Sequence, residues 1–232
     1  MTIDLNCDMG EESGADDEAL MPLFSSANIA CGGHAGDEAS MRRTVELAGR
    51  HGVAIGAHPA YPDRENFGRI ALDLDAARIE QTVFEQVSAL ARIARLKHVK
   101  PHGALYNVAA RDATVAEAIA RGVRRSAGDV ILIGLAKSVM LDTWRRLGFR
   151  VAAEAFADRR YESDGTLRAR IHKDALIVDP AEAAVQALNL IRGGADTLCV
   201  HSDTPGSAGI AAAVRAHLLR EGVRIAPLPR AN

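Results

Sequence analysis

The sequence predicts an α/β protein in which short strands alternate with helices and form a parallel βα barrel. Two observations lead to this prediction. Seven short apolar runs end in polar residues, and stretches with apolar residues at three- and four-residue spacing lie between them. Such alternation is typical of parallel sheets with helical crossovers. The 232 residues show no break in composition, so we expect one domain over 1–232.

The strands are expected at 2–6, 27–31, 53–56, 98–100, 130–133, 151–155 and 197–201. The helices are expected at 39–51, 76–96, 114–126, 138–147, 180–191 and 206–221. Asp75, Asp112 and the pair Asp179-Pro180 are helix-start signals, and Gly52, Gly148 and Gly222 are stop signals. Residues 157–179 are the least regular and are expected to form a long loop or a hairpin cover.

Both a closed barrel of seven or eight strands and an open doubly wound sheet fit this order of strands and helices. The dinucleotide-binding form is disfavoured because no GxGxxG follows the first strand.

Composition excludes several classes of protein. The formal net charge is -2, and the arginine pairs are scattered, so we expect no nucleic-acid partner. No apolar run approaches the roughly 18–20 residues of a membrane helix, and the acidic start MTIDLNCDMGEE does not resemble a secretory signal. Cys7, Cys31 and Cys199 lack a CxxC unit and cannot form a closed disulfide set, which favours reduced thiols in the cytoplasm.

Unusual polar residues follow nearly every expected strand. In a parallel barrel the carboxyl ends of all strands meet at one mouth, and catalytic groups come from several of them. We therefore expect these side chains to share one pocket. They are Asn6, Asp8 and Glu11 after the first strand, Asn28, Cys31 and His34 after the second, His58 after the third, Lys100 and His102 after the fourth, Glu154 and Asp158 after the sixth, and His201 and Asp203 after the last.

Several chemistries fit these residues. Asp8 is a candidate general base, although a helix-capping role explains it equally well. Asp8, His34 and His58 together resemble a metal-ligand set, but no HxH or HExxH unit supports it, so acid–base or hydrogen-bonding histidines are favoured and no metal ligand is assigned. Lys100 could neutralise an anion, form a Schiff base, or pair with Glu154 or Asp8.

Two further chemistries find little support. Ser202 and Ser207 lie near His201 and Asp203, but no GxSxG elbow is present, which disfavours serine catalysis. No GxxxxGK[ST] loop is present either. If ATP is used, another polypeptide is expected to bind it.

Seven sequence blocks resemble the LamB/YcsF family. They are 4–11 (DLNCDMGE), 27–37 (ANIACGGHAGD), 55–63 (IGAHPAYPD), 67–69 (FGR), 99–107 (VKPHGALYN), 156–161 (FADRRY) and 196–206 (DTLCVHSDTPG). They occur in family order and span essentially the whole chain, so their joint specificity is high.

The resemblance implies a seven-stranded barrel similar to polysaccharide deacetylases and a role as the A subunit of an ATP-dependent 5-oxoprolinase. Such a complex hydrolyses 5-oxo-L-proline to L-glutamate with partner subunits B and C, and a partner is expected to bind the ATP. On this basis we expect Asp8, His58, Lys100 and His102 to be catalytic. We expect Asn6, Asn28, His34, Arg69, Glu154, His201 and Asp203 to bind substrate.

Two alternatives remain open at this point. One is a stand-alone metal-dependent amide hydrolase or deacetylase, which would need a divalent metal. The other is a non-catalytic member that scaffolds its partners, although retention of Asp8, His58, Lys100 and His102 argues against it. For the catalytic interpretation, Lys100→Ala and His102→Ala are expected to fold normally and to lower turnover by on the order of a hundredfold.

The sequence departs from the family pattern at a few positions. Gly33 stands where an aromatic is usual, which is expected to widen the pocket. Ala60 replaces a usual Gly, Ile70 an Arg and Ser202 a Gly. The region 192–196 is shorter than usual. These changes leave the polar motif residues in place and bear on substrate fit and partner docking.

Overall fold

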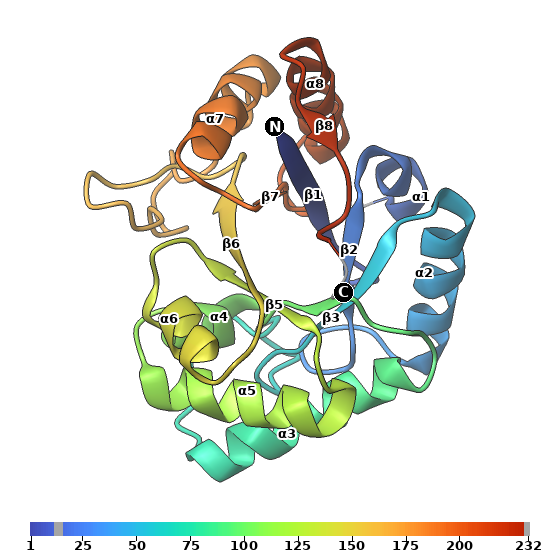
Figure 1. Cartoon of the computed structure of the whole chain (residues 1–232), viewed down its shortest axis with the longest axis vertical. Coiled ribbons are helices and arrows are strands. Elements are labelled where there is room, and N and C mark those ends of the chain that lie inside the picture. Colours follow the sequence, from blue (N-terminus) through green and yellow to red (C-terminus); the bar gives the residue numbers. More distant parts are fainter. Residues whose placement is uncertain (12–15, 230–232) are drawn as a thin grey trace.

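The computed structural model of the chain describes residues 1–11 and 16–229, and it shows parallel strands closed into a barrel with helices around it (Figure 1). The strands are β1 Thr2–Met9, β2 Ser26–Ala30, β3 Ala54–His58, β4 His98–Val99, β5 Ile131–Leu135, β6 Val151–Phe156 and β7 Thr197–Cys199. Each pairs with the next, and β1 pairs with both β2 and β7. The predicted seven-stranded barrel is confirmed, and the open sheet is excluded.

A short eighth strand, β8 (Arg224–Ile225), was not predicted from the sequence. It runs parallel to the start of β1, opposite Thr2 and Ile3. The backbone N–H of Ala226 donates to Ile3 O at 3.0 Å, and that of Ser25 donates to Leu5 O at 2.9 Å. Because alternate residues of a strand bond to the same side, β8 and β2 lie one after the other along one edge of β1.

The helices are α1 Asp17–Leu20, α2 Glu38–His51, α3 Ala76–Ala91, α4 Gly103–Ala109, α5 Ala113–Ala127, α6 Val139–Arg146, α7 Pro180–Arg192 and α8 Ser207–Arg220, with a 3-10 turn η1 at Met21–Leu23. The predicted caps are present: the side chains of Asp75, Asp112 and Asp179 each accept bonds from first-turn N–H groups. Gly52 ends α2 in the left-handed conformation. The short α1 and α4 were not predicted.

Strand β1 shows how the sequence divides the barrel into an outer and an inner surface. Its odd-numbered residues from Ile3 to Met9 are apolar and belong to the main hydrophobic core. Its even-numbered residues Asp4, Asn6 and Asp8 are buried and contact polar side chains of other strands. Because strand side chains alternate between faces, the polar set fills the barrel interior while the apolar set packs against the helices.

A small apolar cluster lies near the amino ends of β5 and β6. Ile131 and Ile133 of β5, Ala152 of β6 and Leu228 of the C-terminal segment form a separate buried cluster. They lie near the amino ends of the strands, so we call them the barrel floor. Most of the buried charged side chains lie toward the carboxyl ends of the strands, where polar groups are expected in an enzyme barrel.

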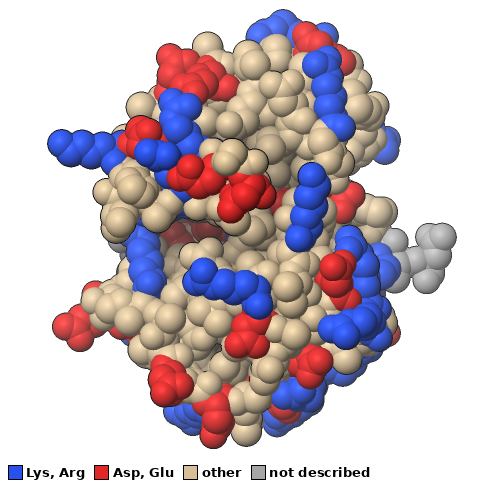
Figure 2. All heavy atoms as spheres, turned by 90° about the vertical axis from the view of Figure 1, so that its left-hand side faces the viewer, with Lys and Arg blue, Asp and Glu red and all other residues tan. Residues whose placement is uncertain are grey.

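Residues 157–179 form the predicted cover. Antiparallel bridges join Arg159 to Leu176 and Tyr161 to Leu167, and the segment projects beside β6 and α7 (Figure 1). Figure 2 shows this side of the molecule, where basic and acidic side chains are interspersed around a hollow at mid-height. Within 1–11 and 16–229, no helix is long and apolar enough to cross a membrane.

Candidate active site

The strand carboxyl ends bring together five predicted residues that are far apart in the chain. Asp8 comes from β1, His34 from the turn after β2, His58 from the end of β3, and Lys100 and His102 from the segment after β4. All five are buried. Glu11, which was also expected at this mouth, lies with them. The expected convergence at one end of the barrel is therefore observed.

Two imidazoles face each other through nitrogens that carry no proton when the rings are neutral. His58 Nδ1 lies 2.7 Å from Lys100 O, and His102 Nε2 lies 3.0 Å from Phe67 O. A carbonyl accepts only, so both of these nitrogens must be the N–H donors. The opposite atoms, His58 Nε2 and His102 Nδ1, lie 3.0 Å apart. Two lone pairs at that distance repel unless a proton or a cation lies between them.

Glu11 brings a carboxyl group to the same point. Its Oε1 lies 3.5 Å from His102 Nδ1 and 2.8 Å from His34 Nε2. Burial, and then the electrostatic effect of His58, lowers the pKa of His34 to about 2, so the 2.8 Å contact is a hydrogen bond from neutral His34 to Glu11. Burial and the Asp8 charge raise the pKa of Glu11 to about 7.

Glu11, His34, His58 and His102 could hold a metal ion, since one ligand atom from each lies within 4.8 Å of the others. Three imidazoles and a carboxylate are typical ligands for zinc. The backbone carbonyls behind His58 and His102 fix their tautomers in the way that a second layer of hydrogen bonds does around metal-bound histidines. The residues present therefore fit a divalent metal.

Asp8 and Lys100 belong to a buried ion network below this cluster. Lys100 Nζ lies 3.0 Å from Asp8 Oδ1 and 2.9 Å from Glu154 Oε1. Burial opposes the charge of Lys100, but the two carboxylates raise its pKa well above the usual range. Burial likewise opposes the charge of Asp8, yet His58 and Lys100 hold its pKa well below the usual range. The ion-pair alternative for Lys100 is what the structure shows, with both carboxylates as partners.

Asn6, Asn28 and Glu154 lie inside the barrel rather than in the cavity wall. Asn28 Nδ2 donates to Asn6 Oδ1 at 2.8 Å and to Asp8 Oδ1 at 2.9 Å. Asn6 Nδ2 donates to Glu154 Oε1 at 3.1 Å. All three side chains are fully buried, so in this geometry they hold Asp8 and Lys100 in place instead of reaching a ligand.

A cavity of about 770 Å³ opens above the network. Asp8, Glu11, His58, Lys100 and His102 line one part of it. Arg69, His201 and Asp203, three of the predicted substrate residues, also line it. Asp203 pairs with Arg69, and its Oδ2 lies 3.0 Å from Arg170 Nη1.

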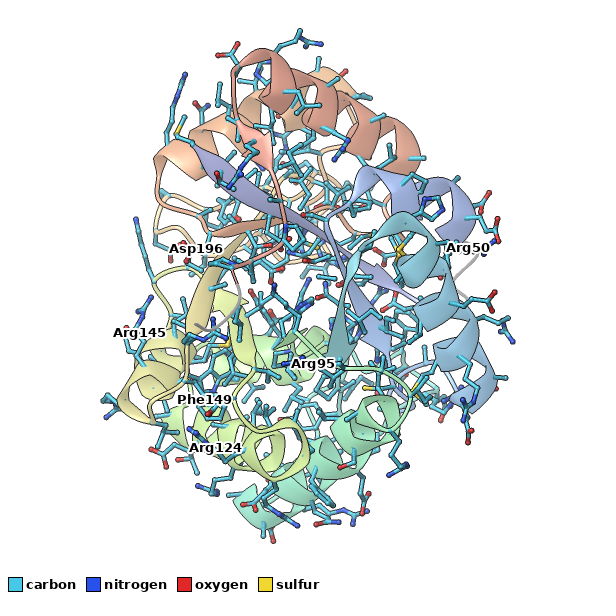
Figure 3. All side chains as sticks on the ribbon, turned by 45° about the vertical axis from the view of Figure 1, so that its right-hand side comes forward. Arg50, Arg95, Arg124, Arg145, Phe149 and Asp196 are labelled. Carbon is cyan, nitrogen blue, oxygen red and sulfur yellow. The ribbon has the colours of Figure 1, made fainter. Side chains whose placement is uncertain are left out.

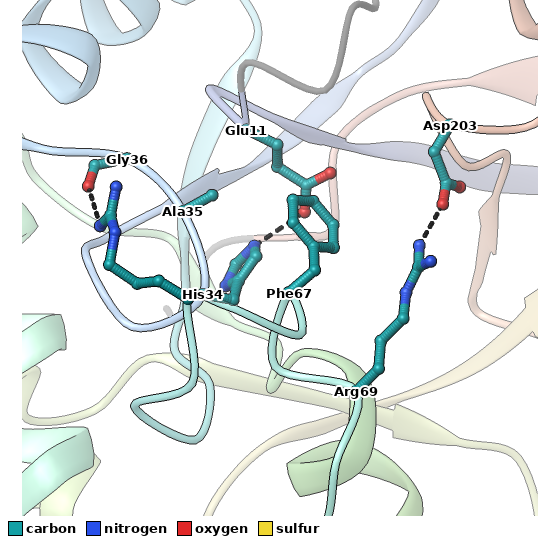
Figure 4. Close-up of a pocket in the computed structure, with 8 residues that line it drawn as sticks. Glu11, His34, Ala35, Gly36, Phe67, Arg69 and Asp203 are labelled. Atoms are coloured by element: carbon teal, nitrogen blue, oxygen red, sulfur yellow. Dashed lines mark hydrogen bonds and ion pairs between the residues drawn. The ribbon is translucent and has the colours of Figure 1, made fainter.

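A smaller cavity of about 470 Å³ adjoins the first at Glu11, and Figure 4 shows His34, Phe67 and Arg69 in its wall. Phe67 places its ring edge-on against His34 and His102, and its φ of 55° is unusual for a residue other than glycine. This backbone conformation points the Phe67 carbonyl at His102.

Gly33 does not widen either cavity. A Cβ on Gly33 would come within 2.3 Å of Gln86 Oε1, so the side chain of Gln86 fills the space that an aromatic at residue 33 would need. Gln86 also bonds to both backbone groups of Ala60, at 3.0 and 2.8 Å. The expected enlargement of the pocket is therefore not observed.

The region 192–196, which was expected to be shorter than usual, joins α7 to β7 at the amino ends of the strands. Asp196, labelled in Figure 3, holds it there, because its Oδ2 accepts from the backbone N–H of Ala153 at 2.8 Å. This end is opposite the candidate site, and none of residues 192–196 lines either cavity.

The fold and the site together define a class of protein. A closed parallel barrel with buried carboxylates and imidazoles at the strand carboxyl ends is typical of a barrel enzyme. Residues 3–232 match the LamB/YcsF family, and the chain belongs to that family.

The relatives share nearly full length with this chain. It is 52% identical to the 5-oxoprolinase A subunit of Chloroflexus aggregans (97% of this chain, 98% of the relative) and 46% identical to that of Bordetella pertussis (96% and 97%). A lactam utilization protein from Thermus thermophilus is 39% identical with a TM-score of 0.92 (98% of this chain, 100% of that chain). A family 4 carbohydrate esterase from Streptomyces lividans, 12% identical with a TM-score of 0.57 (98% and 93%), shares the fold.

Proposed function

We propose that this chain is the hydrolytic A subunit of an ATP-dependent 5-oxoprolinase, which opens 5-oxo-L-proline to L-glutamate. The observation that carries the proposal is the convergence of Glu11 Oε1, His58 Nε2 and His102 Nδ1 on one point at the cavity wall. Three acceptor atoms so arranged can hold a water molecule and take its proton. The names of the full-length relatives support the lactam as substrate.

The chemistry requires water to add to the carbonyl carbon of a five-membered cyclic amide. In this proposal the proton of the attacking water passes to His58 Nε2, the ring C–N bond breaks, and the nitrogen takes a proton to become the amine of glutamate. Asp8 Oδ2, 3.4 Å from His58 Nε2, stabilises the imidazolium that forms. His102 then holds the water, and Lys100 keeps Asp8 ionised and in position. Lys100 is therefore a positioning residue in this proposal.

ATP and the partner subunits belong to the activation step. A lactam is a stable amide, and coupling to ATP offsets the cost of opening it. We propose that subunits B and C bind ATP and activate the carbonyl, and that this chain supplies water. The lack of a phosphate-binding GxxxxGK[ST] loop in the sequence supports ATP binding elsewhere.

Metal-assisted hydrolysis by this chain alone is a second candidate function, favoured by the same cluster. Glu11, His58 and His102 would hold the metal, with His34 orienting Glu11 through their hydrogen bond. A bound divalent metal would lower the pKa of water and polarise the carbonyl. His58 would then be a ligand and not the base.

Reconstitution tests the first candidate. Purified chain is mixed with subunits B and C, ATP and 5-oxo-L-proline, and glutamate is assayed. Product that requires all three subunits supports the proposal, and no product from folded subunits contradicts it. Metal content of the purified chain and activity after chelation decide the second candidate: hydrolysis of an amide by the chain alone, lost on chelation and restored by metal, would replace the first.

A further inference from the structure

Arg159 is a buried cation with an unused donor in the cavity wall. It follows β6 at the start of the cover segment, is only 7% exposed, and lines the 770 Å³ cavity. One guanidinium nitrogen donates to Arg168 O at 2.8 Å. Among the described residues, Arg159 Nε has no hydrogen-bond partner. Such orphaned buried donors are rare, so this one calls for an explanation.

The carboxylates near Arg159 are already committed to other groups. Asp158 bonds to His201 Nδ1 at 3.0 Å and to Thr204 Oγ1 at 2.6 Å. Asp203 is shared by Arg69 and Arg170. Across 1–11 and 16–229, no carboxylate lies within ion-pair distance of Arg159. Burial, and then the charge of Arg170, even lowers its pKa.

A buried charge without a partner destabilises the fold that holds it. An anion that enters the cavity would lie beside the guanidinium and supply the missing counter-charge. Arginine is well suited to this, because its planar fork can donate two parallel bonds to a carboxylate. The cavity therefore has two chemically different parts, with acid–base groups around His58 and an unpaired guanidinium at Arg159.

We propose that Arg159 binds the carboxylate of the substrate and so selects a lactam that carries an acid group. This inference rests on the proposed function, since 5-oxo-L-proline has one carboxylate beside its ring amide. Tyr106 lines the same cavity, and burial and the Glu154 charge hold the pKa of its hydroxyl well above the usual range. That hydroxyl stays neutral and offers no charge to a carboxylate. In this proposal Arg159 makes the charge-dependent contact, and the His58 and His102 cluster acts on the ring.

The test compares Arg159→Gln and Arg159→Lys with the matched control Arg160→Gln. Arg160 is the next residue, but it is more exposed and pairs with Glu182 of α7. KM and kcat for 5-oxo-L-proline are measured in the complex with subunits B and C. Inhibition by 2-pyrrolidinone, the same ring without the carboxylate, is measured in parallel.

Arg159→Gln is expected to raise KM for 5-oxo-L-proline by roughly ten- to a hundredfold, the loss typical of a hydrogen bond to a charged group. Arg159→Lys is expected to recover part of that loss. The inhibition constant of 2-pyrrolidinone should change little in either variant, and Arg160→Gln should match wild type. Thermal melts of each variant confirm folding.

The inference is overturned if a folded Arg159→Gln keeps the wild-type KM, or if it weakens 2-pyrrolidinone as much as 5-oxo-L-proline. It is also overturned if the variant instead loses inhibition by inorganic phosphate with KM for 5-oxo-L-proline unchanged, which would make Arg159 a phosphate site. These outcomes require a wild-type complex that forms glutamate. Absence of glutamate from wild type is failure of the proposed function itself.

Discussion

Replacing Lys100 by Met removes the cation that holds two buried carboxylates together. Lys100 is 2% exposed and lies within 3.0 Å of both Asp8 and Glu154. Methionine has similar length and no charge, so the change leaves Asp8 and Glu154 buried without their partner. Breaking a buried ion pair from one side typically costs about 3–5 kcal/mol. The sequence-based expectation that Lys100→Ala folds normally is therefore replaced by an expected loss of stability.

For a chain of this size, 1 kcal/mol shifts the melting temperature by about 2–4 °C, so we expect a fall of about 6–20 °C. Equilibrium unfolding in urea and thermal melts followed by circular dichroism measure both quantities. Lys173→Met, at an exposed lysine of the cover, is the matched control and should change stability little.

A second substitution separates the ion network from simple loss of packing. Glu154→Gln in the Lys100→Met background removes one of the two unpaired charges, so the double variant should be more stable than the sum of the single changes predicts. Coupling between contacting residues of this kind is about 0.5–3 kcal/mol. If Lys100→Met melts like wild type, or if the two changes are additive, the buried network does not contribute as argued.

Three further predictions concern the barrel interior and the cluster. A Cβ on Gly56 would lie 2.1 Å from His98 Nε2, so Gly56→Ala should destabilise the chain by about 1–3 kcal/mol in urea unfolding, and an unchanged midpoint would contradict this packing. Burial lowers the pKa of His98 in the folded chain to about 3. Between pH 3 and 6.5 the His98 imidazole therefore binds a proton in the unfolded chain but not in the folded one. The free energy of unfolding should fall as the pH drops through that range, by up to about 1.4 kcal/mol per pH unit. His98→Gln should flatten that slope, whereas parallel pH–stability curves would exclude His98 as its source. If the Glu11–His58–His102 cluster holds zinc, His102→Ala should weaken zinc binding by tenfold or more in calorimetric titration with the metal alone, while equal affinity in both proteins would remove His102 from the ligand set.

The positions of the strands could be predicted because each strand carries its own apolar run. All seven predicted strands are present, and the cover over 157–179 has the expected hairpin form. The elements that were missed are too short to show a period. β8 has two residues, and α4 begins directly after Pro101-His102 without a side-chain cap.

The candidate site could be predicted only in part. The convergence of Asp8, His58 and His102 follows from barrel topology alone, because strand carboxyl ends meet at one mouth. Glu11 was expected at the same mouth, but its contacts with His34 and His102 could not be predicted, since they depend on a turn at Gly10 whose φ is 71°. Arg159 lies within the block FADRRY but has no distinguishing spacing that would mark it as a binding residue.

The interior position of Asn6 has a signal in the sequence. In the first strand, polar residues occupy every second position from Asp4 to Asp8, which is the period of a strand with one polar face. Proximity to the strand end instead suggested that Asn6 binds substrate. Alternation, rather than proximity to the strand end, decides which side chains reach the cavity and which fill the barrel.

Through Leu228, the C-terminal segment is part of the apolar cluster that we call the barrel floor. Leu228 is 6% exposed and packs in one buried cluster with Ile131, Ile133 and Ala152. A chain that ends before Leu228 would lose part of this cluster. Water would then reach the barrel interior from the amino ends of the strands, toward the polar groups that hold Asp8 and Lys100. Truncation of the C-terminal segment would then disturb the candidate active site at the opposite end of the barrel. An affinity tag is therefore better placed before Met1 than in place of the C-terminal residues.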